Sequence, residues 1–132
     1  VALEEAEKVA IVSLASKRDD ILIYPEMVKA EVALDNGEVL GVEAAPYFTF
    51  HDPERKISPP RLSAAEAQKK VSPYLKVEDT TKVVILNDLF QEVLCYESKG
   101  AVGEDRFLVY INASTGEEEK IKRIDKYGAE LE

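Results

Sequence analysis

The sequence is poor in the residues that build disulfides, membrane spans and nucleic-acid interfaces. Its 132 residues include a single cysteine, Cys95, so an intrachain disulfide cannot form. No apolar run approaches the ~20 residues that a membrane-spanning helix requires, and no signal peptide is recognisable. The net charge is −9, which argues against nucleic acid and against an anionic membrane surface as partners.

Catalytic groups are equally scarce. The single histidine, His51, stands beside Asp52, and a functional interpretation is half of an acid–base pair or a metal ligand. No second histidine or partner cysteine exists to complete such a site, so we expect a solvated loop histidine. Cys95 lies in the alternating run VLCY and is predicted to point into a core rather than to act as a nucleophile. We therefore expect no catalytic, cofactor-binding or metal-binding residues.

Carboxylates and glycines do not form a recognisable site either. Glu117, Glu118 and Glu119 follow a turn, and a charged strand edge that discourages aggregation explains them. Residues 35–38 are too few for a calcium-binding loop with its alternating ligands. The glycines of residues 100–103 lack the spacing of a phosphate-binding loop.

What the sequence does contain is a pattern that occurs twice. Residues 1–16 align without a gap with residues 83–98, each with two apolar segments around a polar turn. Residues 29–38 align with residues 106–117, and both turns close with Gly-Glu. Two matches in the same order predict a duplicated four-stranded unit.

Eight strands are predicted from alternation and turn signals. Val28, Ala30 and Val32 alternate with Lys29 and Glu31, which is the period of a half-buried strand. The pair at 36–37, Asn-Gly, predicts a hairpin, and the glycine at 116 is expected in a left-handed conformation. The predicted strands are residues 1–4, 8–15, 27–34 and 38–44, then 82–87, 92–99, 106–112 and 118–124.

Residues 62–75 are the one predicted helix. Ser63 and Glu66, three residues apart, form a capping box at its start. Pro73 is expected to end or distort the helix, because it bars the preceding residue from helical geometry. The stripe that should be buried repeats every four residues: Ala67, Val71 and Leu75.

The segment before this helix, residues 46–61, is predicted to be a linker. It holds four of the six prolines, which prevent a regular ladder of hydrogen bonds. Three of its aromatic residues are candidates for an interaction patch: Tyr47, Phe48 and Phe50. The alternative is that they fill the gap between two small modules.

These elements predict an α+β fold of two tandem units, each a four-stranded antiparallel sheet. Residues 1–45 form the first unit, 46–61 the linker and 62–130 the second unit, whose helix packs on one face of its sheet. The first unit lacks a helix, which by the repeat belongs before Val1. We therefore expect its uncovered face to be buried against the second unit or a second chain. The last two residues resemble a vector-derived tail, so the chain is expected to be part of a longer protein.

The order of one helix and four strands, with the run FLVYINASTGEEE, resembles a PepSY domain. Residues 112–117 match the turn of that family's late hairpin, and residues 63–67 match its S-x-x-E-A helix. The pair at 113–114, Ala-Ser where Ala-Glu is expected, is a minor departure. Four segments resemble more narrowly the C-terminal half of YpeB-type spore germination proteins: residues 33–44, 69–78, 92–100 and 107–121.

The resemblance implies a non-enzymatic regulatory or protein-interaction module. Members of that family are anchored by an N-terminal hydrophobic segment at the outer side of the spore inner membrane. They work with a SleB-type cortex-lytic enzyme, and each protein needs the other for stable incorporation into the spore. A homodimer through the uncovered first sheet is a further expectation. Two alternatives stay open: a generic peptidase-inhibitor or propeptide-like module, and a peptidoglycan or small-ligand sensor.

Overall fold

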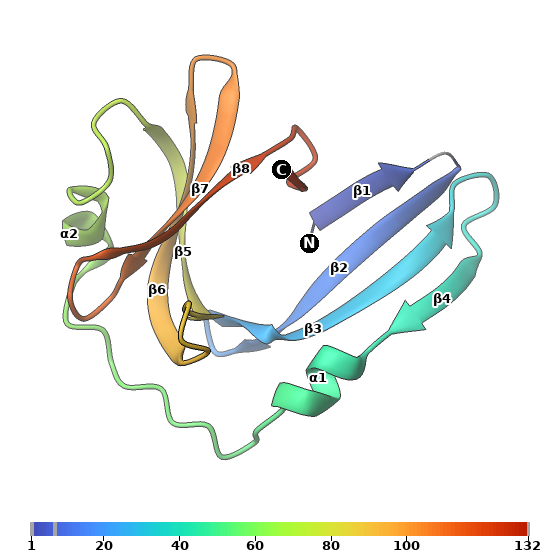
Figure 1. The fold of residues 1–132 in the computed structure, drawn as a ribbon, viewed down its shortest axis with the longest axis horizontal. Coiled ribbons are helices and arrows are strands. Elements are labelled where there is room, and N and C mark those ends of the chain that lie inside the picture. The colour runs from blue at the N-terminus through green and yellow to red at the C-terminus, as the bar shows by residue number, and fades with distance from the viewer. Residues whose placement is uncertain (1, 7, 132) are drawn as a thin grey trace.

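A computed structural model describes residues 2–6 and 8–131 as one curled sheet with two short helices. Figure 1 shows the sheet as an open half-barrel with both helices on its outside. The helices are α1 (Ala45–Phe50) and α2 (Ala64–Gln68). The strands are β1 (Ala2–Ala6), β2 (Val9–Arg18), β3 (Ile21–Ala33), β4 (Val39–Glu43), β5 (Lys76–Leu86), β6 (Glu92–Val102), β7 (Asp105–Asn112), β8 (Glu118–Ile124) and β9 (Glu130–Leu131).

The predicted fold of two separate antiparallel sheets is wrong. The strands form a single nine-stranded sheet in the order β1-β2-β3-β5-β6-β7-β8-β9, with β4 paired to β3. The two halves join where residues 21–23 of β3 pair in parallel with residues 82–84 of β5. Strand β3 has 13 residues. This length lets its two ends pair with different strands: residues 21–23 pair with β5, and residues 29–32 pair with β4. The sheet is mixed and continuous, and helices contribute little to it.

Strand β3 also begins earlier than predicted, because a β-bulge carries the chain past Pro25. The register with β2 shifts between Ala15 and Ser16, where Ala15 faces Met27 and Ser16 faces Ile23. The three residues between them, 24–26, are therefore left out of the ladder. A bulge tolerates proline, which lacks the N–H that a regular ladder needs.

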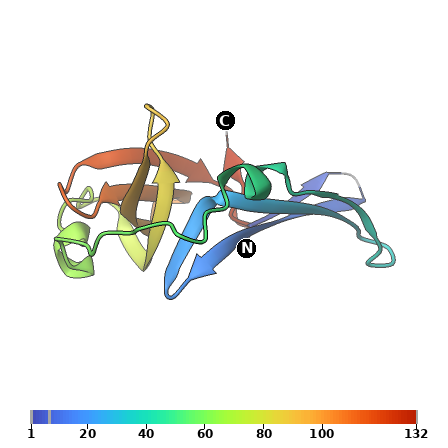
Figure 2. The same cartoon turned by 90° about the horizontal axis from the view of Figure 1, so that it is seen from below.

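The remaining strands lie near the predicted positions, but several of their bounds differ. Strand β5 begins at residue 76 rather than 82, and β9 was not predicted. Gly116 has the expected left-handed backbone, with φ of 78°. In the turn at 36–37 only Gly37 is left-handed, with φ of 74°. Figure 2 shows the tip of the β5–β6 hairpin (yellow) standing clear of the neighbouring elements.

The predicted helix 62–75 is wrong in length, although its signals are correct. The capping box between Ser63 and Glu66 is present. After α2 the chain continues in tighter turns, such as the bond from the N–H of Lys70 to the carbonyl of Ala67 at 3.0 Å. Pro73 cannot donate a helical hydrogen bond, so these turns replace the second half of the helix. None of the described helices has the length and hydropathy of a membrane span.

Residues 62–75 nevertheless cover one face of β6 and β7, mostly with turns and not with the predicted helix. The expected stripe is buried there, and Leu62 packs against its edge. The opposite face of this half holds a second group of buried side chains from β5, β6 and β7. The first cluster contains Ala67, Val71, Leu75, Tyr96, Val109, Ile111 and Ala113, and the second contains Val83, Ile85, Cys95 and Tyr110.

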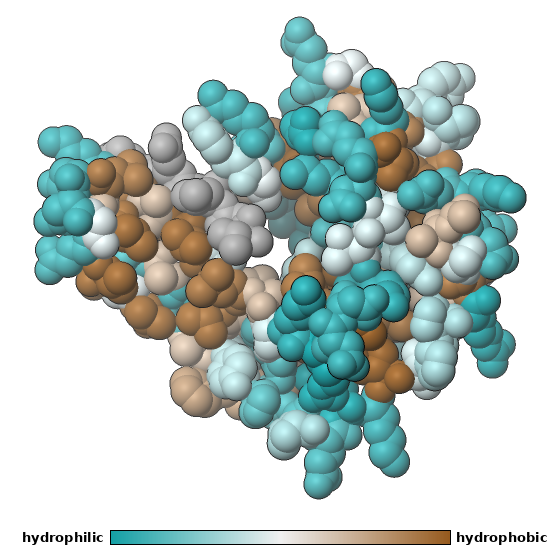
Figure 3. Space-filling model, turned by 180° about the vertical axis from the view of Figure 1, so that it is seen from behind, coloured by the Kyte–Doolittle hydropathy of each residue, from teal (hydrophilic) through white to brown (hydrophobic). Residues whose placement is uncertain are grey.

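One face of β2, β3 and β4 is not covered by the second half of the sheet, so of the two predicted covers the second chain stays a prediction. Val12, Ala30 and Val42 are cross-strand neighbours on this face. Val42 is 65% exposed, and Leu14 on the same face of β2 is 46% exposed. The halves join edge to edge instead of face to face, so neither half covers this surface. Figure 3 shows hydrophobic side chains gathered over this part of the molecule.

Candidate functional site

The bulge in β3 positions two sites that the sequence did not reveal. Successive side chains of a strand point to opposite faces, so Tyr24 and Glu26 share a direction in a regular strand. The bulge separates them. Tyr24 enters the concave side of the sheet, whereas Glu26 contacts the linker that follows α1.

The first site is a buried polar cluster around Glu26, which is only 4% exposed. One carboxylate oxygen accepts from Nδ1 of His51 at 2.8 Å and from a guanidinium nitrogen of Arg55 at 3.1 Å. The other oxygen accepts from the hydroxyl of Ser16. Arg55 also lies 2.6 Å from Glu92 at the start of β6. The cluster thus ties the linker to both halves of the sheet.

This environment controls the charge of Glu26. Burial by itself raises the pKa of the carboxyl, but hydrogen bonds from Ser16, His51 and Arg55 outweigh it and lower the pKa to about 2. The group is therefore a carboxylate at neutral pH, with its charge opposed by Arg55. These contacts hold the linker against the sheet, so we interpret the cluster as a structural contact and not as a catalytic site. We call this contact between Glu26, His51 and Arg55 the latch.

The prediction of an exposed loop histidine is confirmed for the position of His51, but it missed the hydrogen-bond partner. The ring of His51 is 42% exposed, bonded to Glu26, and stacked on Tyr47 with ring centroids 4.8 Å apart. Sequence reasoning missed its partner because Glu26 is distant in the chain and no local pattern marks it. The only signal was Pro25, which indicates an interrupted strand.

The structure separates the three candidate aromatic residues. Tyr47 and Phe50 are half-buried in α1, where Tyr47 also contacts Phe48 edge to face at 5.5 Å. Phe48 is 77% exposed. The side chain that remains available to a partner is therefore Phe48, while Tyr47 helps to hold His51.

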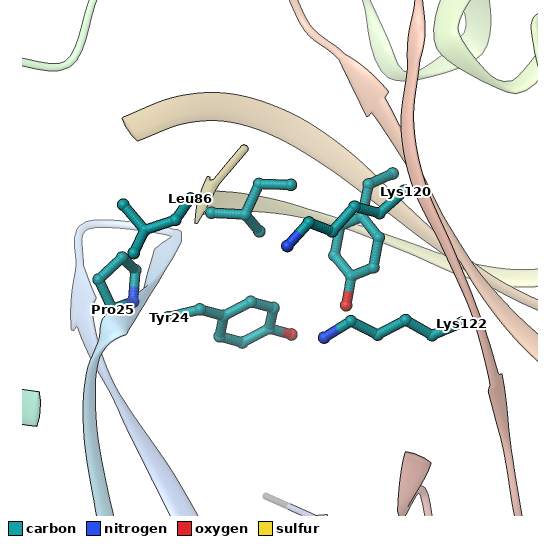
Figure 4. Close-up of a pocket in the computed structure, with 7 residues that line it drawn as sticks. Tyr24, Pro25, Leu86, Lys120 and Lys122 are labelled. Atoms are coloured by element: carbon teal, nitrogen blue, oxygen red, sulfur yellow. The ribbon is translucent and has the colours of Figure 1, made fainter. Parts of the chain in front are cut away.

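The second site lies on the concave side of the sheet (Figure 4). The hydroxyl groups of Tyr24 and Tyr110 both donate to the same oxygen of Glu97, each at 2.6 Å. Burial, followed by the charge of Glu97, raises the pKa of both tyrosines, so both phenols stay protonated. The rings meet edge to face with centroids 6.5 Å apart. This contact connects β3 with β7 across the sheet.

Beside these rings is a cavity of about 190 Å³. Its walls are Tyr24, Pro25, Ile85, Leu86, Tyr110, Lys120 and Lys122. Figure 4 shows the Lys120 and Lys122 side chains reaching from β8 toward Tyr24. Two ammonium groups over an aromatic and aliphatic wall can bind an anionic group that carries an apolar part. Sequence reasoning had assigned this part of β8 only to a protected strand edge.

The other sequence candidates stay structural. Cys95 is fully buried, which confirms its predicted place in the core, and burial raises the pKa of its thiol to about 12. Within residues 2–6 and 8–131, no group of three or more histidine, cysteine or acidic side chains is arranged to hold a metal ion. Glu117 and Glu118 are exposed at the start of β8, while Glu119 accepts a hydrogen bond from Asn112 at 3.0 Å.

Comparison with known proteins places the chain in a family. Residues 1–58 match the family model described as "YpeB sporulation, PepSY1 and PepSY2 domains". Sporulation protein YpeB of Bacillus subtilis (strain 168) is 39% identical over 118 residues, which is 89% of this chain. The Bacillus megaterium YpeB C-terminal domain superposes with a TM-score of 0.89 at 31% identity, over 96% of this chain. The chain is a YpeB-like PepSY protein.

The YpeB-like chain corresponds to a part of its relatives. Sporulation protein YpeB of Halalkalibacterium halodurans is 36% identical over 123 residues, 93% of this chain but 27% of that protein. The Bacillus subtilis protein is covered to 26% and the Bacillus megaterium domain to 56%. The chain thus spans about a quarter of the length of the curated relatives, whose shared name connects it with sporulation.

Proposed function

We propose that this YpeB-like chain is a non-enzymatic protein-interaction module that stabilises or restrains a spore cortex-lytic enzyme. The observation that carries the proposal is the match to sporulation protein YpeB over most of the chain. We further propose that the complete protein lies at the outer side of the spore inner membrane, anchored by a segment outside this sequence. The tandem units and their boundaries at residues 45 and 61 stay a prediction.

Two surface features support an interaction role. The open face of β2–β4 exposes the apolar side chains of Leu14, Val39 and Val42. Exposed apolar patches of this kind mark interaction sites. Phe48 adds an exposed aromatic ring beside this half of the sheet. Large apolar side chains at a protein surface supply most of the binding energy of typical interfaces. We assign the open face to the enzyme partner, with a second copy of the chain as the competing occupant.

The test uses the full-length protein with its cognate SleB-type cortex-lytic enzyme. We expect direct binding by calorimetry, and a changed rate of peptidoglycan hydrolysis or a higher melting temperature of the enzyme. Val42→Ser should weaken binding, whereas Glu104→Gln, at the exposed β6–β7 turn, should not. Absence of binding together with an unchanged rate and stability contradicts the proposal. Concentration-dependent dimers that Val42→Ser abolishes would assign the face to a second copy.

The concave cavity favours a second candidate, a sensor of peptidoglycan fragments or another small anion. Its lysines and tyrosines converge on a space of about 190 Å³. Stem peptides of peptidoglycan carry carboxylates, which Lys120 and Lys122 can pair with. Thermal shift with purified muropeptides tests this function. An increase in melting temperature that Lys120→Gln/Lys122→Gln removes supports it, and an unchanged melting temperature excludes it at the concentrations used.

A further inference from the structure

The five-residue turn between β5 and β6 holds its backbone in an uncommon conformation at Phe90. The N–H of Phe90 donates to the carbonyl of Asn87 at 3.0 Å, and φ at Phe90 is 58°. The side-chain oxygen of Asn87 accepts from the N–H of Leu89 at 2.9 Å and from that of Gln91 at 3.0 Å. These bonds fix the turn. They also require the left-handed region at a residue whose bulky side chain disfavours it.

A second turn of the same chain shows which residue this geometry normally takes. The N–H of Gly128 donates to the carbonyl of Asp125 at 3.1 Å, and φ at Gly128 is 88°. The Asp125 carboxylate accepts from the N–H groups of Tyr127 and Ala129, at 2.8 and 3.0 Å. The hydrogen-bond pattern is the same as in the β5–β6 turn, but glycine occupies the left-handed position. Turn formation alone therefore does not explain Phe90.

Packing within the described residues does not explain it either. Phe90 is 83% exposed and Leu89 beside it is 75% exposed. The hairpin tip that carries them projects from the sheet in Figure 2. Two adjacent large apolar side chains are thus held in solvent on a rigid turn. Such preorganised anchors lose little conformational entropy when a partner buries them.

We propose that the Leu89–Phe90 tip is an anchor that inserts into an apolar pocket of a partner protein with a basic rim. Asp88 lies at the apex of the turn, and residues 87–92 contain no lysine or arginine. The whole chain carries a net charge of −9. This charge favours a basic rim, and it opposes an anionic bilayer, which attracts apolar tips that are flanked by basic residues. The inference rests on the proposed function, so the partner is the cortex-lytic enzyme.

The experiment separates the role of the tip in binding from its role in folding. Full-length protein with Phe90→Gly, and separately with Leu89→Ser, is titrated with the cognate enzyme by calorimetry, and melting temperatures are recorded. Each variant should bind about 10- to 100-fold more weakly, the loss typical of an anchor residue. The melting temperature of Phe90→Gly should equal or exceed that of the unmodified protein, because glycine relieves the left-handed backbone. Tyr74→Ser, at another exposed aromatic residue (82% exposed), should change neither quantity.

Four other outcomes overturn the inference. Unchanged affinity of both tip variants, with normal binding by the unmodified protein, removes the tip from the interface and leaves the proposed function intact. Unchanged affinity with a lower melting temperature would mean that the tip packs against another part of the full-length protein instead of against a partner. Binding of the unmodified protein to phosphatidylglycerol vesicles, lost in Phe90→Gly while enzyme affinity persists, assigns the tip to a membrane. No binding by the unmodified protein contradicts the proposed function itself, and with it the enzyme as occupant.

Discussion

In one half of the sheet, residues 62–75 cover β6 and β7 with apolar side chains, whereas the other half holds its outer segment through a buried ion pair. Ala67, Val71 and Leu75 pack on the first surface and are each less than 10% exposed. On the other side, α1 and the linker are fixed by Glu26 and Arg55, while the face of β2–β4 stays open. One half of the sheet is covered by apolar side chains, whereas in the other half the latch holds the linker against the sheet.

The difference shows how one sheet can contain a stable part and a surface available for binding. Hydrophobic burial stabilises in proportion to area, so the half under residues 62–75 is expected to be the more stable one. A buried ion pair mainly fixes geometry, because desolvation offsets much of its attraction. The latch thus positions the linker without covering the apolar face beside it. Variants on the two sides of the molecule test this contrast.

The largest effect is expected from Arg55→Ala. Its side chain is 6% exposed, and its loss leaves the buried carboxylate of Glu26 without a positive partner. Removing one member of a buried pair costs about 3–5 kcal/mol of unfolding free energy. Urea unfolding measures this loss. Arg123→Ala removes an ion pair whose side chains are both 55% exposed, and it should cost at most about 1 kcal/mol. Similar losses for both arginines would disprove the latch.

Leucine truncation compares the covered and the open half directly. Leu75→Ala removes a side chain that is 8% exposed and packs against the covered face of β6 and β7. It should lower the free energy of unfolding by about 2–3 kcal/mol through lost burial and a cavity. Leu40→Ala, at a position 53% exposed in β4, should change it by no more than about 0.5 kcal/mol. Equal losses would mean that the face of β2–β4 is covered in solution.

Two glycines in strands sharpen the same comparison. A Cβ at Gly100 in β6 would lie 2.5 Å from the carbonyl oxygen of Lys76 and 3.0 Å from Leu75. Gly100→Ala should therefore cost about 1–3 kcal/mol, as overpacking does. At Gly41 in β4 the nearest atom is a Glu31 carboxylate oxygen 4.0 Å away, so Gly41→Ala should be nearly neutral. Thermal unfolding of the two variants measures the difference. A destabilised Gly41→Ala would show that atoms lie closer to Gly41 than the 4.0 Å to Glu31.

The pH dependence of stability gives the most specific signal. The pKa of Glu26 is about 2 in the folded protein, against an ordinary value of 4.5. A lowered pKa contributes stability that is fully present above 4.5 and is lost as the pH falls toward 2. Glu26→Gln should therefore lose less stability than the unmodified protein over that interval, as measured by melting temperature. Parallel pH profiles would contradict the low pKa of Glu26.

Local signals predicted most strand centres, the turns and the start of the helix correctly. Alternation located the strand centres, and the Ser63–Glu66 capping box marked the start of α2, since both depend on residues close in sequence. The same signals failed for the site around Glu26 and for the tyrosine pair on Glu97. Those contacts join residues that are 10 to 73 positions apart, such as Ser16 with Glu26 and Tyr24 with Glu97.

The sequence by itself determined the periodicity, the capping box, the buried stripe of residues 62–75 and the family resemblance. Each depends on neighbouring residues or on a recognisable motif. Only the tertiary structure decided that the two halves form one sheet, because the parallel pairing of residues 21–23 with 82–84 depends on long-range register. It also decided that Phe90 is left-handed and exposed. Backbone conformation at a turn depends on the hydrogen bonds that close it, and the sequence NDLFQ carries no glycine to announce it.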